Sequence, residues 1–277
     1  MRINMGWIKT TILQVLYFVY IIISTLIIIE VIFQILPTTS PVDLKPITDE
    51  SEILSYLPNQ ETTIALGSTF YQVVKKSTNN YGFYSPFDYV QGSQPDIVIV
   101  GDSYVEAAQI KSEGSLGEVV KINNPDLNIY QLGISGAALS QYVHMIRFAE
   151  REFSPKEYVV AIVGNDFDQS LCSYRPKLGN WCYNDQMEPV FIPFTGYSFK
   201  RSLGRKSAFL RYLVFQLRLD WRLVVQSLGL GDEGLKSVPE FSGHTERFKS
   251  ANVKEKSYLV IEKFFDELVE MGVSENI

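Results

Sequence analysis

The sequence predicts an α/β protein with a doubly wound parallel sheet in a three-layer α/β/α domain, preceded by one transmembrane helix. Three apolar runs support the sheet, because each ends in glycine and polar residues as buried parallel strands tend to do. The runs are 96–101 (DIVIVG), 128–136 (NIYQLGISG) and 157–166 (EYVVAIVGND). Helical stretches lie between them, and this alternation is typical of a doubly wound sheet.

One apolar segment near the N-terminus predicts a retained membrane anchor at residues 12–36. Its 25 residues can cross a hydrocarbon layer of ~30 Å and exceed the ~7–15 apolar residues of a cleaved signal peptide. Arg2 and Lys9 precede the segment and mainly acidic residues follow it, so the positive-inside rule places residues 1–11 in the cytoplasm. We therefore expect a single-pass membrane protein whose main domain is extracytoplasmic, either periplasmic or at the cell surface.

Glu30 lies inside this apolar segment, where ionisable residues are rare. Its carboxylate could extend toward the outer membrane surface or a locally wet position, and this interpretation is favoured. Alternatively, Glu30 makes a polar contact with a partner helix.

After the anchor, we expect a linker with an N-terminal extension at 37–94 and a domain at 95–277. The first part begins with PTTSPVDLKPITDESE, whose prolines and acids are typical of an extended linker. Regular alternation is lost at about 171–243, which we interpret as an insertion. The helices that we expect in the domain are 114–121, 138–153, 207–228 and 255–272.

The helix expected at 207–228 carries Arg211, Arg218 and Arg222 on one face. This pattern favours a packing helix with a basic stripe. The alternative is a helix that lies on an acidic membrane surface.

Composition limits the classes of partner and cofactor. With 46% hydrophobic residues, 20% charged residues and a net charge of −6, the chain is globular and unsuited to electrostatic binding of nucleic acid. Cys172 and Cys182 enclose nine residues, so an extracytoplasmic location favours a disulfide over two unpaired thiols. Two cysteines and two histidines without a local cluster give little support to a metal site.

The three predicted strands deliver chemically useful groups to one edge of the sheet. Ser103 follows the first strand, Gly136 the second and Asn165 the third, and ligands bind outside the carboxyl ends of such strands. A serine at a strand-to-helix turn can act as a nucleophile when a base takes its proton. The backbone amides of Ser103 and Gly136 and the carboxamide of Asn165 could stabilise an oxyanion.

These residues carry a resemblance to the SGNH superfamily, the GDSL-like esterases and acyltransferases. The stretches GDSYVEA, LGISGAALSQY and VGND resemble its first three sequence blocks, over about residues 97–166. The resemblance implies a flavodoxin-like three-layer fold, with Ser103 as nucleophile and with Gly136 and Asn165 in the oxyanion hole. We expect no cofactor and no metal. The resemblance does not imply the Gly-x-Ser-x-Gly turn of the α/β-hydrolases, because residues 101–105 read GDSYV.

Two positions depart from the family pattern. Val163 stands where the third block usually begins with glycine, and the Asp-x-x-His block that supplies the family's base is missing from this sequence. His144, expected within a helix, and His244, in an irregular segment, are the alternatives, and a structural or exposed role is favoured for both. We expect a chain truncated before the end of its domain, because no strand follows the last helix either.

Three acidic residues near the predicted strand ends have simpler interpretations. Asp102 is expected to cap the helix that follows it rather than to take part in catalysis. Asp166 and Asp168 could suggest a metal pair, but they flank a probable turn and have no recognisable cation-loop spacing.

The resemblance, together with the predicted location, therefore implies an esterase or O-acyltransferase for acetyl or other acyl esters of an extracytoplasmic carbohydrate. The alternative is an inactive SGNH-like component that binds carbohydrate or assists assembly in an envelope polysaccharide system, and the missing histidine supports it. A nucleotide-binding domain ranks last, because the sequence has no glycine-rich phosphate loop.

Overall fold

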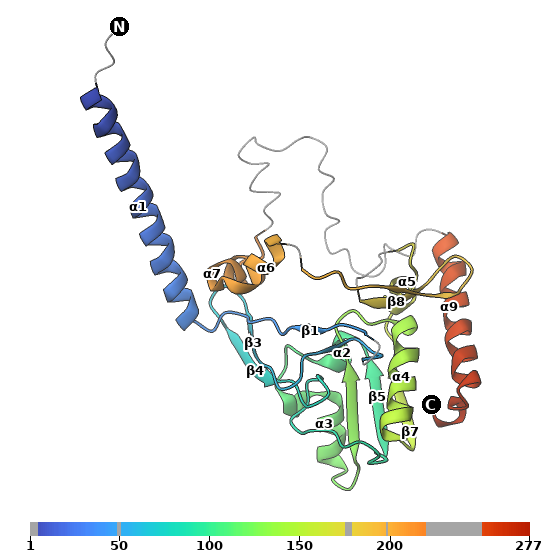
Figure 1. Ribbon diagram of the computed structural model, residues 1–277. Helices are drawn as coiled ribbons and strands as arrows, with labels where there is room; N and C mark the ends of the chain where they lie inside the picture. Colours follow the sequence, from blue (N-terminus) through green and yellow to red (C-terminus); the bar gives the residue numbers. More distant parts are fainter. Residues whose placement is uncertain (1–4, 49–50, 175–178, 198, 220–250) are drawn as a thin grey trace. The chain divides into compact units, whose positions relative to one another are not determined.

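A computed structural model describes residues 5–48, 51–174, 179–197, 199–219 and 251–277 (Figure 1). The chain divides into two compact units. The first comprises Met1–Pro41, Thr63–Val73 and Tyr197–Gly231, and the second comprises Val42–Thr62, Val74–Gly196 and Asp232–Ile277.

The first unit contains one long apolar helix, α1 (Met5–Ile35). Within α1, the 25 residues Thr11–Ile35 are long and apolar enough to cross a membrane. This range agrees closely with the apolar segment predicted at 12–36.

Short helices near residue 200 also belong to the first unit. They are α6 (Phe199–Lys206), α7 (Ala208–Arg211) and a π-helical turn at Tyr212–Gln216. The helix expected at 207–228 is therefore shorter, because Leu217 ends the π-helical turn and Arg218 has a φ of 51°. Arg222 lies outside the described residues.

Three parallel strands form the sheet of the second unit, as the sequence predicts. They are β5 (Ile97–Gly101), β6 (Ile129–Gly133) and β7 (Glu157–Ala161), in the order β6-β5-β7. Gly101 pairs with Gly133 on one side and with Ala161 on the other, so all three carboxyl ends lie at one edge.

Helices connect these strands close to the predicted positions. The β5–β6 connection contains α2 (Ser103–Glu106), a 3₁₀ turn (Ser112–Gly114) and α3 (Leu116–Asn123), and the β6–β7 connection is α4 (Leu139–Phe153). The protein is thus an α/β protein with a parallel sheet.

Alternate residues of β5 pack into two different hydrophobic clusters. Val98 and Val100 belong to the larger cluster, which includes much of α4. Ile97 and Ile99 contact a smaller cluster together with Val120 of α3. Because every second side chain of a strand points to the same face, β5 is apolar on both faces, which explains its continuous apolar sequence.

After β7, the chain forms α5 (Asp166–Gln169) and an antiparallel hairpin of β8 (Asn180–Tyr183) and β9 (Pro189–Ile192). A disulfide joins Cys172 to Cys182, with 5.1 Å between their Cα atoms, which confirms the predicted pairing. The last long helix, α9 (Ala251–Glu270), contributes core residues that pack near α4, and a 3₁₀ turn (Ser274–Asn276) follows it.

The stretch expected as a linker and extension, 37–94, supplies short strands and several core residues. The strands are β1 (Leu44–Lys45), β2 (Ser55–Tyr56), β3 (Glu61–Leu66) and β4 (Gln72–Ser77). The core residues are Val42, Ile53, Leu54, Tyr56, Phe83, Tyr84 and Tyr89. The second unit therefore includes part of the chain that precedes residue 95.

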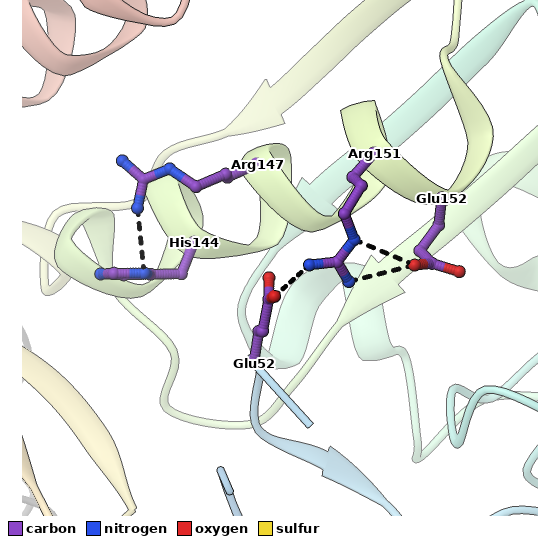
Figure 2. A network of polar contacts seen from close by, with 5 residues as sticks. All are labelled: Glu52, His144, Arg147, Arg151 and Glu152. Carbon is purple, nitrogen blue, oxygen red and sulfur yellow. Dashed lines mark hydrogen bonds and ion pairs between the residues drawn. The ribbon is translucent and has the colours of Figure 1, made fainter. Parts of the chain in front are cut away.

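Polar contacts also join this early stretch to α4. The guanidinium of Arg151 on α4 forms an ion pair with Glu52 and a second one with its neighbour Glu152, as Figure 2 shows. All three side chains are partly exposed, so we expect the two ion pairs to stabilise the fold only slightly.

Candidate active site

Ser103 is held at the exit of β5 by a capped turn. Asp102 is buried, and its Oδ1 accepts a hydrogen bond of 2.9 Å from the backbone N–H of Tyr104. This bond caps the first turn of α2, as predicted for Asp102. Ser103 itself is exposed, and its Oγ donates a long hydrogen bond of 3.5 Å to Oδ2 of Asp102.

Two glycines allow α2 to pack closely over the strand ends. A Cβ at Gly133, the last residue of β6, would collide with the backbone N of Glu106, and one at Gly101 would collide with the Val105 side chain. Neither collision involves the far end of a flexible side chain, so both positions require glycine. The close packing fixes where α2 begins, and therefore where Ser103 lies.

Gly136 occupies the third position of a tight turn. The turn is closed by a hydrogen bond of 2.9 Å from the N–H of Ala137 to the carbonyl of Ile134. Gly136 has a φ of +78°, the value that position i+2 of a type II turn requires and that favours glycine. Turn geometry alone therefore explains a glycine here, whatever its backbone N–H does.

Asn165 lies between β7 and the short helix α5. The next residue, Asp166, is fully buried, and its Oδ2 accepts hydrogen bonds from the N–H of Val163 (2.8 Å) and the hydroxyl of Tyr142 (3.0 Å). These bonds fix the turn and leave the half-buried Asn165 at the cavity described next. Asp166 therefore has a structural role in the turn.

A cavity of about 690 Å³ lies at the carboxyl ends of the strands. Ser103 and Asn165 both line it, while Gly136 adjoins another lining residue, Ser135. The remaining lining residues are Asp102, Tyr104, Ala107, Ala108, Gln109, Ile110 and Gln169. Among these lining residues the buried Asp102 is the only acidic residue, and none is a lysine, an arginine or a histidine.

The strand order explains why a cavity forms at this place. From the central strand β5 the chain passes to β6 on one side, and then crosses to β7 on the other. The connection after β5 therefore runs toward one edge of the sheet, and the connection after β6 runs back toward the other edge. Ligands of open α/β sheets bind where the direction reverses in this way.

The buried carboxylate of Glu106, the last residue of α2, was not predicted from the sequence. Oε1 of Glu106 accepts a hydrogen bond of 2.8 Å from the hydroxyl of Tyr56, and Nζ of Lys76 donates one of 2.6 Å to the carbonyl of Ala107. Burial raises the pKa of Glu106 and lowers that of Lys76. The position of Glu106, one helical turn after Ser103, was the only local signal that this carboxylate lies near the site.

The structure places His144 away from the cavity lining. Its ring stacks on that of Trp181. Figure 2 shows its contact with Arg147, in which Nδ1 lies 3.4 Å from Nη1. Burial and the positive charge of Arg147 lower the pKa of His144 to about 4. His144 thus has the packing role that the sequence favours, and His244 lies outside the described residues.

Within the described ranges, no group of three or more His, Cys, Asp or Glu side chains is arranged to hold a metal ion. Asp166 and Asp168, the pair considered from the sequence, are both buried on α5. Asp166 is engaged by Tyr142 and Val163, which is sufficient reason for a carboxylate at that position.

Neither the models of known protein families nor the curated proteins include a match to this chain. The resemblance of residues 97–166 to SGNH hydrolases accordingly stays a prediction, carried by the three sequence blocks.

Proposed function

We propose that the protein is a membrane-anchored serine esterase or O-acyltransferase of the SGNH type. The observation that carries this proposal is the meeting of Ser103 and Asn165 at one cavity, at the carboxyl ends of parallel strands. The family resemblance assigns the nucleophile and an oxyanion donor to these same two residues.

The proposed reaction has two steps. Oγ of Ser103 attacks the acyl carbonyl and passes its proton to a base, the bond to the ester oxygen breaks, and the alcohol leaves after it takes up a proton. The carboxamide of Asn165, with the amides of Ser103 and Gly136, stabilises the oxyanion. Water then attacks the acyl-serine and releases a carboxylic acid, or a sugar hydroxyl attacks and accepts the acyl group.

The residues that line the cavity favour a substrate group without charge. Its amide side chains, Gln109, Asn165 and Gln169, can form hydrogen bonds to hydroxyl and carbonyl oxygens. No lysine or arginine lines the cavity in the described part of the chain, so we propose an acylated neutral sugar rather than a phosphorylated one.

A second candidate function is an SGNH-like domain without catalysis, which binds acylated carbohydrate within envelope polysaccharide machinery. It is favoured by the lining of the cavity, because no histidine contributes to it among the described residues. His144 stacks on Trp181 instead.

We also propose the location and the finer architecture. Helix α1 would cross the membrane once with its N-terminus in the cytoplasm, which leaves the domain in the extracytoplasmic space. The disulfide between Cys172 and Cys182 supports that location, because disulfides persist in oxidising compartments. The two hydrophobic clusters at β5 support helical layers on both faces of the sheet.

Covalent labelling tests the assignment of the nucleophile. The full chain is purified in detergent and treated with a fluorophosphonate, which forms an Oγ–P bond and releases fluoride when a serine is activated. We expect the label on Ser103 by mass spectrometry, no label in Ser103→Ala, and normal labelling in Ser112→Ala, whose hydroxyl belongs to the nearby 3₁₀ turn.

Turnover of a chromogenic acetyl ester, with and without an oligosaccharide acceptor, then separates hydrolysis from transfer. Equal rates for the unsubstituted chain and Ser103→Ala would contradict catalysis by Ser103. If neither labelling nor turnover occurs but acetylated neutral oligosaccharides bind in calorimetry, the second candidate function is supported.

A further inference from the structure

Glu30 is joined to the start of α7, within the first unit. Its Oε1 accepts a hydrogen bond of 2.7 Å from the N–H of Ala208. Its Oε2 accepts one of 2.7 Å from the hydroxyl of Ser207 and one of 3.2 Å from the N–H of Phe209. A carboxylate at a helix N-terminus satisfies backbone donors that have no partner within the helix. The contact thus explains an acid inside the apolar sequence of α1.

Further contacts hold the same segment along the end of α1. The ring of Phe33 lies 5.3 Å from that of Phe209 and 4.6 Å from that of Tyr212. Nε2 of Gln216 donates to Oγ1 of Thr39, just beyond α1, at 2.7 Å. Residues 207–212 are therefore held against α1, and Gln216 is held to the chain just beyond it.

These contacts determine how far from the end of α1 the start of α7 lies, measured along the helix axis. Glu30 lies five residues before the end of α1 at Ile35, which corresponds to ~7.5 Å at a rise of about 1.5 Å per residue. Amphipathic helices at membrane surfaces bury their apolar faces by about 5–10 Å. The start of α7 lies at a comparable depth.

The composition of the segment suits a membrane surface with negative charge. Residues 199–219 contain no Asp or Glu, and their basic residues are Lys200, Arg201, Arg205, Lys206, Arg211 and Arg218. The same segment exposes large apolar side chains, which are Leu203, Val214, Phe215, Leu217 and Leu219. This combination is typical of helices that lie in the interface plane of an anionic bilayer.

We propose that residues 199–219 form a membrane-surface element, which inserts its apolar side chains among the lipids around α1 and places its basic side chains at anionic headgroups. The inference rests on the proposal that α1 spans a bilayer. The occupant of this apolar surface is the bilayer itself, because the surface is joined to the anchor through Glu30 and Phe33. The inference goes beyond the catalytic proposal, because it assigns to the chain a second contact with the membrane.

Spin labels on the full chain in vesicles test the proposal. A nitroxide is attached to Phe215→Cys, to Ile27→Cys in α1, and to Ile122→Cys in α3, all of which are exposed positions. Collisions with oxygen and with a water-soluble nickel chelate report whether each label lies in lipid or in water. The vesicles contain phosphatidylcholine with or without phosphatidylglycerol.

We expect the Ile27 and Phe215 labels to favour oxygen and the Ile122 label to favour nickel. In vesicles with phosphatidylglycerol, Arg218→Gln should lower the ratio between the label populations in lipid and in water at position 215 about fivefold. A Phe215 label in water beside an Ile27 label in lipid would overturn the membrane-surface element and leave the anchor standing. If both labels lie in water, the anchor fails and the inference with it. Val214→Cys repeats the test at a second exposed position.

Discussion

The imidazole of His144 lies flat against the indole of Trp181, with 4.2 Å between the ring centroids and 13° between the planes. Trp181 belongs to β8, next to the disulfide-bonded Cys182, so the contact joins α4 to the β8–β9 hairpin. Burial and the positive charge of Arg147 keep the imidazole neutral near pH 7. His144 is therefore part of the packing between α4 and this hairpin.

The first prediction concerns the pH dependence that His144 gives to stability. Its pKa falls from an ordinary value of 6.5 to about 4 in the folded chain. The stability from the neutral form is present above pH 6.5 and is lost as the pH falls toward 4, by up to roughly 3 kcal/mol. In His144→Phe, which keeps an aromatic ring on Trp181, this loss should be absent from unfolding curves followed by circular dichroism. A variant whose stability falls with acid as steeply as that of the unsubstituted chain would contradict this role.

A second prediction concerns Glu106, whose pKa is raised by burial despite the nearby Lys76 and the hydrogen bond from Tyr56. A raised carboxyl pKa gives stability that is complete below the ordinary value of about 4.3 and is lost as the pH rises through the folded pKa. Glu106→Gln keeps an acceptor for Tyr56 and should remove this part of the pH dependence. The exposed Glu262→Gln is the matched control and should keep the slope of the unsubstituted chain.

The third prediction tests the packing of α2 over β6. Gly133→Ala places a Cβ against the backbone of Glu106, so α2 must shift, at a cost of about 1–3 kcal/mol or more. The labelling of Ser103 should also fall, because α2 carries this residue. Gly114→Ala is the control, since its Cβ meets only the Ile110 side chain, at an ordinary distance of 3.5 Å. Equal stability of the two variants in chemical unfolding would refute the packing argument.

The fourth prediction rests on the proposed function and concerns Asn165. If its carboxamide stabilises the oxyanion, Asn165→Ala should lower kcat by about 10²–10³-fold and change KM little. Gln169→Ala, at another amide that lines the cavity, should lose much less. Steady-state kinetics with the chromogenic ester measure both, and a loss confined to KM would assign Asn165 to substrate binding instead.

The last prediction concerns the contact of Glu30 with α7. Glu30→Ala removes the acceptor for the amides of Ala208 and Phe209. The two bonds are part-buried and go to a charged group, and such bonds contribute about 1.5–3 kcal/mol. We therefore expect these amides to exchange with deuterium roughly ten- to a hundredfold faster. Gln14→Ala, in the same helix, should leave their exchange unchanged. Unaltered exchange in Glu30→Ala would show that the contact does not stabilise α7.

Local patterns in the sequence were sufficient for the regular elements. The strands at 97–101, 129–133 and 157–161 and the helix α4 lie within the predicted runs, and the Cys172–Cys182 disulfide follows from spacing and expected location. Such features leave a local trace, because burial on both faces requires a continuous apolar run and burial on one face requires a helical period. The helix expected at 207–228 is interrupted near Leu217, where contacts from Gln216 to Thr39 and to the carbonyl of Ala65 fix the chain.

By itself, the sequence determined the parallel strands, the apolar N-terminal helix, and the small and polar residues at the strand ends. Only the tertiary structure decided the order β6-β5-β7, the shape of the cavity that Ser103 and Asn165 line, and the burial of Glu106 beside Tyr56 and Lys76. The physical reason is that periodicity reports how each residue is buried relative to its near neighbours. Contacts between residues thirty or more positions apart depend on how the elements pack, and no local pattern records that.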